Sequence, residues 1–208
     1  MKTPVRAAAA AMAALALCAC GHSGASDSST ASAAASASQP STSNDSGAAS
    51  DGMMTLLPTG NLVIQVPGDA VTGTTTTYDD GMQQTYYDSR GSIPLTVAVE
   101  YYAAGAKPAA SILTAEQQAL TAQSIQPKVT PVDVPGGSGA NRLDWQTTAI
   151  PPWLQDRKTS EVPITCAGII VDGPGGESYG VYVFADPKNQ ESLNRMSSVL
   201  TSVAVSAS

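Results

Sequence analysis

The 208-residue chain has a single histidine, and this scarcity limits its possible chemistry. His22 lies near the N-terminus among small polar residues, so we expect it to be neither a ligand nor a catalytic group. Unless that segment folds back, a Ser-His-Asp triad, a histidine-ligated zinc site and a histidine-ligated haem are excluded.

Basic residues are also few. Ten Lys and Arg stand against 17 Asp and Glu, which gives a net charge of −7 and an isoelectric point near 4.4. Because phosphate binding needs a basic surface, we expect no nucleic-acid partner.

No hydrophobic run is long enough to cross a membrane. The longest uninterrupted run at the N-terminus, residues 7–17, follows Lys2 and Arg6. As a helix it would span about 16 Å, roughly half of a ~30 Å hydrocarbon core. A secretory signal is therefore favoured over a transmembrane anchor.

This run leads into residues 15–20, LALCAC, which resemble a bacterial lipobox, where signal peptidase cuts before a lipid-modified cysteine. We favour Cys20, because it places the small Ala19 at the cleavage position, whereas Cys18 would place Leu17 there. An ordinary secretory signal with incidental cysteines is the alternative. We therefore predict a signal peptide over 1–19 and lipidation, including palmitate, at Cys20.

The predicted lipid sets the location of the protein. Cleavage removes Lys2 and Arg6, so the mature chain carries a net charge of −9 and is repelled by anionic lipid. Attachment to the cell membrane must then come from the acyl chains, with the protein on the extracytoplasmic side. Residues 21–50 hold eleven Ser and eight Ala and no Leu, Ile or Val, so we expect a disordered tether over 20–51.

Residues 52–208 are predicted to form a single globular α+β domain. Its pattern is an antiparallel sheet flanked by helices. For the middle helix two starts compete, one at Pro108 and one at a capping box beginning at Thr114; Asp186 is the expected cap of the last helix. The expected strands are 62–66, 74–78, 83–88, 93–101, 129–134, 142–148, 164–172, 178–185 and 203–205.

This order of elements resembles the PsbP-like fold. The resemblance covers about residues 55–205 and rests on a strand ending in Val66-Pro67-Gly68, a middle helix, two long late strands and a last helix running into residues 202–205. Actinobacterial lipoproteins of the LpqN type share this fold together with a signal and a tether. The resemblance implies an α/β/α sandwich and a non-enzymatic accessory role in the cell envelope, and it supplies no functional residues.

Two candidate nucleophiles are interpreted as structural. Residues 136–139, GGSG, approach a nucleophile elbow, but Ala140 stands where its last glycine belongs and no histidine is at hand. Cys166 lies in an apolar strand without a partner cysteine in the domain, so we expect a buried, unreactive thiol.

Carboxylates and one tryptophan are the other candidates. Asp79, Asp80 and Asp88, or Asp172 and Glu177, could bind Ca²⁺ at a hairpin tip, but their spacing is not that of a calcium loop, and solvated turn residues are the favoured interpretation. Trp153 is either a loop anchor in the core, which we favour, or an exposed platform for a sugar or a protein. We expect no metal and no cofactor.

The leading functional hypothesis is a membrane-anchored, non-catalytic binding or accessory module whose partner is an envelope protein or a glycan. A cell-wall or glycan hydrolase with paired carboxylates is the alternative. A solute-binding protein is disfavoured, because 157 residues rarely make two lobes with a cleft.

Overall fold

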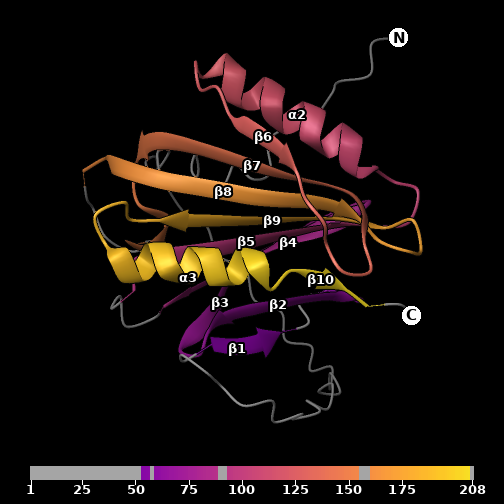
Figure 1. The fold of residues 1–208 in the computed structure, drawn as a ribbon, viewed down its shortest axis with the longest axis horizontal. Helices are drawn as coiled ribbons and strands as arrows, with labels where there is room; N and C mark the ends of the chain where they lie inside the picture. Colours follow the sequence, from indigo (N-terminus) through magenta and orange to yellow (C-terminus); the bar gives the residue numbers. More distant parts are fainter. Residues whose placement is uncertain (1–52, 57–58, 89–92, 155–159, 207–208) are drawn as a thin grey trace, which may run out of the picture.

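The computed structural model describes residues 53–56, 59–88, 93–154 and 160–206. These residues form a seven-stranded sheet, a three-stranded sheet and two α-helices (Figure 1). The predicted signal peptide, with Cys18 and Cys20, and the predicted tether, with His22, lie outside the described residues and stay predictions.

All neighbouring strands of the large sheet are antiparallel, as predicted. Asp79 and Asp80 form the turn of one predicted hairpin, and residues 173–177 connect two neighbouring strands in the middle of the sheet. Pro131 lies in an edge strand, where its missing N–H breaks no ladder. In spatial order the strands are β3 (Ala70–Tyr78), β4 (Gly81–Asp88), β5 (Leu95–Tyr102), β9 (Ser178–Ala185), β8 (Val162–Asp172), β7 (Ser138–Ala149) and β6 (Lys128–Pro131).

The small sheet is centred on β2 (Leu62–Pro67). Both of its neighbours, β1 (Met53–Leu56) and β10 (Ala204–Val205), pair with it in antiparallel register, so the two ends of the domain meet there. Leu62, Ile64 and Val66 alternate along β2 and are buried in the same cluster as residues of the large sheet. The small sheet therefore covers part of one face of the large sheet.

The middle helix, α2 (Ala109–Ala122), begins at the first of its two predicted starts. Pro108 is the residue before the helix, where its lack of an N–H costs nothing. The start at Thr114 is wrong: its hydroxyl donates to the Ala110 carbonyl oxygen, 2.8 Å away, inside the helix.

The last helix, α3 (Gln190–Thr201), begins later than predicted. Its cap is Asn189, whose side chain accepts a hydrogen bond of 2.9 Å from the Ser192 N–H. The predicted cap, Asp186, is wrong, because this carboxylate accepts from the Lys188 N–H in the preceding turn.

The two helices lie on opposite faces of the large sheet, which confirms the predicted α+β sandwich. Along β5, Val97 and Val99 face α3 and β2, whereas Ala98 and Tyr102 face α2. Figure 1 shows α3 crossing in front of the central strands and α2 lying near the β6–β7 edge. The described residues contain these two α-helices, and neither of them is long and apolar enough to cross a membrane.

Candidate functional site

Two glutamates are buried where α2 packs on the large sheet. Glu100, on β5, is 1% exposed, and Glu116, on α2, is 5% exposed. Glu116 lies four residues after Ile112 and four before Leu120, so it occupies the stripe that α2 turns toward the sheet. The helix thus carries a carboxyl group into its own hydrophobic interface.

Tyr182, on β9, brings a hydroxyl to the same place. Its ring lies flat against the sheet because two glycines leave room for it: a Cβ at Gly168 would lie 2.6 Å from its Cδ1, and one at Gly180 would lie 2.7 Å from its Cε2. A Cβ at Gly180 would also lie 2.9 Å from the Tyr182 hydroxyl oxygen. Gly180 pairs directly with Glu100 on β5. The glycines therefore direct the Tyr182 hydroxyl toward the Glu100 carboxyl.

Hydrogen bonding in this group is incomplete among the described residues. Gln83 Nε2 donates to Glu100 Oε1 across 3.3 Å, whereas Glu100 Oε2 and the Tyr182 hydroxyl have no partner of acceptable geometry. The hydroxyl is nevertheless near enough to lower the pKa of Glu100. Nearby, Lys107 Nζ lies 3.5 Å from the Tyr102 hydroxyl and 4.7 Å from the centre of its ring. We call these six residues the acidic cluster: Gln83, Glu100, Tyr102, Lys107, Glu116 and Tyr182.

Burial dominates the electrostatics of the cluster. It raises the pKa of Glu100 to about 8, with a further rise from Glu116 and an opposing effect from Lys107. It raises the pKa of Glu116 to about 7, and Lys107 again opposes. Glu100 therefore keeps its proton at neutral pH, because the ionised carboxylate would be poorly solvated there.

Chemically, such a pair could hold and exchange a proton. Two carboxyls with raised and unequal pKa values are typical of acid–base sites. Here, however, both are buried between α2 and the sheet, and neither of two surface hollows found among the described residues includes them. Among the described residues there is also no group of three or more His, Cys, Asp or Glu side chains suited to a metal ion.

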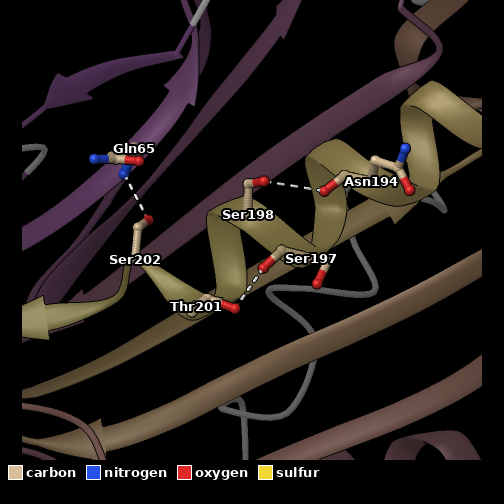
Figure 2. Close-up of a pocket in the computed structure, with 6 residues that line it drawn as sticks. All are labelled: Gln65, Asn194, Ser197, Ser198, Thr201 and Ser202. Carbon is tan, nitrogen blue, oxygen red and sulfur yellow. Dashed lines mark hydrogen bonds between the residues drawn. The ribbon is translucent and has the colours of Figure 1, made fainter. Parts of the chain in front are cut away.

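One surface hollow, of about 490 Å³, lies between β2 and α3 (Figure 2). Two of its lining residues are joined directly, since the Gln65 N–H donates to Ser202 Oγ across 2.8 Å. The hydroxyls of Ser198 and Thr201 donate to carbonyls one turn earlier in α3, which leaves their lone pairs to accept. The lining consists of neutral amide and hydroxyl groups: Gln65, Asn194, Ser197, Ser198, Thr201 and Ser202.

The second hollow, of about 450 Å³, lies where β7 and β8 approach the turn before α3. Lys188 is the charged residue of its lining, and Pro163, Ile164 and Pro187 make it partly apolar. Neither hollow contains a carboxylate, so neither is suited to glycoside hydrolysis, which needs two.

The structure separates the carboxylates considered for Ca²⁺. Asp79 and Asp80 are exposed at the β3–β4 turn, while Asp88 is buried at the far end of β4 and accepts from the Ile93 N–H across 2.8 Å. The interpretation of Asp88 as a solvated turn residue is therefore wrong.

The pair at the β8–β9 turn has structural partners as well. Asp172 accepts from the Ala109 N–H across 2.7 Å and from Ser178 Oγ across 2.6 Å, so it stabilises the start of α2 from 63 residues away. Glu177 is buried over its own turn, with Oε1 3.4 Å from both Asn61 Nδ2 and the Tyr179 hydroxyl.

Two other candidates behave as expected. Trp153, in the short helix η1 (Pro152–Leu154), is 8% exposed and belongs to the core under α2, so it is a loop anchor and the exposed platform is wrong. Cys166 is buried, and burial raises the pKa of its thiol.

The glycine-rich loop of residues 136–139 has a structural role. A Cβ at Gly136 would overlap the Val205 carbonyl oxygen, so a glycine at this position allows β10 to pack closely against the loop.

Sequence reasoning missed the acidic cluster. Glu100 lies on the same side of its strand as Thr96, and no local pattern indicates that a helix covers that side. A signal was present in α2, because Glu116 interrupts the spacing of Ile112 and Leu120 inside the apolar stripe. The glycines at 168 and 180 gave no comparable signal, since their role depends on strand register.

No known protein family matches the chain, and no curated protein matches it in sequence. Among solved structures, the chain is similar to the solution structure of cyanobacterial PsbP (CyanoP) from Synechocystis sp. PCC 6803. The match has a TM-score of 0.48 and 8% sequence identity and covers 77% of this chain and 99% of that one. The likeness concerns the arrangement of strands and helices.

Proposed function

We propose that this protein is a membrane-anchored lipoprotein that faces the extracytoplasmic side and acts as a non-catalytic binding module of the cell envelope. The anchor is the covalent lipid at Cys20, and residues 20–51 are the tether. The partner is an envelope protein or a glycan, and no cofactor takes part.

One observation carries the choice of binding over catalysis. Glu100 and Glu116 are buried between α2 and the large sheet, while the surface hollow between β2 and α3 offers neutral hydrogen-bonding groups. Neutral amides and hydroxyls suit the recognition of a polar ligand, whereas acid–base hydrolysis needs a carboxyl group that touches the substrate.

The anchor is tested by Cys20→Ala with Cys18→Ala as the matched control. We expect Cys20→Ala to move the protein from the membrane fraction to the medium, or to retain it as uncleaved precursor, and Cys18→Ala to leave it anchored. A cleaved Cys20→Ala protein that still sediments with membranes would contradict the proposal.

A second candidate, a cell-wall or glycan hydrolase, is favoured by the raised pKa values of the glutamate pair. It is tested with purified peptidoglycan and glycan substrates, using the wild type and Glu100→Gln. Hydrolysis that Glu100→Gln abolishes would replace the proposed binding role; we expect no hydrolysis by either protein.

A further inference from the structure

The two edges of the large sheet differ in how they are protected. The β6 edge has four residues and carries Lys128 and Pro131, both of which discourage pairing with another strand. The β3 edge has nine residues and contains neither lysine nor proline. Among the described residues no strand pairs with its outer side, so its outward N–H and C=O groups form an open ladder.

The side chains of β3 favour strand pairing. Six of its nine residues are exposed, all of them valine or threonine, and Val71 is 37% exposed, the one large hydrophobic residue so exposed among the described residues. β-Branched side chains suit a paired strand. A bulge between Thr72 and Thr75 interrupts the ladder, so the regular part that another strand could join is 75–78.

The charge around this edge limits the possible occupant. Asp69 precedes β3, and Asp79 and Asp80 follow it, while residues 59–88 contain no Lys or Arg. A second copy would bring another strand with acidic flanks and no basic residue to an edge that is itself acidic, and this like charge is unfavourable. A strand with a basic residue at the end that lies beside Asp79 and Asp80 would instead meet opposite charge there.

We propose that the outer edge of β3 binds an extended segment of a partner protein, with β-branched residues in its middle and Lys or Arg at the end beside Asp79 and Asp80, which joins the sheet as an additional strand. In this mode main-chain hydrogen bonds provide affinity and the end charges provide selectivity. The inference rests on the proposed binding role and selects a protein segment as the partner.

The test uses the full chain in a nonionic detergent and a short fluorescent peptide with alternating Thr and Val between terminal lysines. A second peptide with terminal glutamates has the same middle. We expect the lysine peptide to bind and to slow amide hydrogen exchange within 75–78, and the glutamate peptide to bind at least about tenfold more weakly.

Two sets of variants locate the site. Neighbouring residues in the regular ladder direct their N–H groups to opposite sides of the strand. Of the two variants Thr76→Pro and Thr77→Pro, one therefore removes an outward N–H and keeps the β3–β4 pairing. Unchanged amide hydrogen exchange in β4 and β5 identifies this variant, and its affinity for the lysine peptide should fall about tenfold. Asp79→Asn with Asp80→Asn keeps turn-forming residues and should weaken binding roughly two- to fivefold, while the exposed Asp133→Asn, on the other edge, should not.

Equal binding of both peptides, or protection outside β3, would overturn the inference and leave the binding role intact at another surface. Slowed exchange of β3 without peptide, together with a concentration-dependent dimer, would overturn it in favour of a second copy. The binding role itself is overturned by a different result, hydrolysis that requires Glu100. The peptide assay does not measure hydrolysis, so the two failures are distinguishable.

Discussion

The two faces of the seven-stranded sheet are each covered by one α-helix, but they are filled differently. On the α3 face, Val97 and Val99 meet aliphatic side chains of β2, β9 and α3. On the α2 face, the next residues of the same strand include Glu100, which meets Glu116 and Tyr182. Apolar burial stabilises the first face at any pH, whereas packing of the second also depends on pH, because burial favours the protonated forms of its two acids.

The largest expected effect comes from placing an acid on the apolar face. Val99→Glu buries a carboxyl among aliphatic side chains, so we expect it to lower the free energy of unfolding at pH 7 by more than about 4 kcal/mol. Urea unfolding followed by circular dichroism measures this change. A loss below about 1 kcal/mol would mean that both faces tolerate acids and that the contrast between them is wrong.

The next effect is pH dependence on the α2 face. Both glutamates have a pKa of 4.5 when exposed and about 8 and 7 in the fold, so the folded protein binds more protons than the unfolded chain within this window. Stability is therefore fully present below pH 4.5 and falls as the pH rises toward 8. For Glu100 the loss is on the order of 4 kcal/mol.

Urea unfolding across pH 5 to 8.5 checks this slope, with Glu100→Gln as the diagnostic variant. The introduced amide cannot ionise, so we expect the variant to be less pH-dependent and more stable than the wild type at pH 8. The matched control is Glu191→Gln, an exposed residue of α3 paired with Arg195, which should leave the slope unchanged. If Glu100→Gln keeps the wild-type slope, the acidic cluster is not its origin.

A third effect tests the space that Gly168 and Gly180 leave for the Tyr182 ring. Gly180→Ala places a Cβ 2.7 Å from the Tyr182 ring, and overpacking of this kind costs up to about 3 kcal/mol. In a Tyr182→Leu background the ring is gone, so the same substitution should cost less. If the losses in free energy of unfolding are additive in this double-mutant cycle, Gly180 does not position the Tyr182 ring.

The smallest effect concerns Cys166, also on the α2 face. A hydroxyl in this apolar position lacks the hydrogen bonds it has in water, so Cys166→Ser should cost about 1–3 kcal/mol. Because burial raises the pKa of the thiol, we expect a thiol reagent to label the protein only after denaturation. Rapid labelling of the native protein would instead identify Cys166 as accessible.

Local signals predicted most of the elements but not the helix caps. The strand pattern of 164–172 and 178–185 and their glycine-rich turn correspond to β8 and β9, because alternation and turn residues act within a few positions. The sequence is compatible with two starts of α2, and it favours the wrong cap for α3. The first turn of α2 is stabilised by Asp172, which is distant in the chain, and α3 is capped by Asn189, one of several nearby residues whose side chain could serve as a cap. The acidic cluster was missed because its members lie on β4, β5, β9, α2 and a loop.

The class of the domain, its antiparallel strands and the burial of Cys166 could be predicted from the order and spacing of neighbouring residues, which also predict a lipid anchor. The folded structure was needed to show that Glu100 lies under a helix, that Asp172 stabilises the start of that helix, and that β3 is an open edge of the described sheet. Burial, pKa and the pairing of an edge are set by residues far away in the chain, and no local pattern specifies which of them will be neighbours.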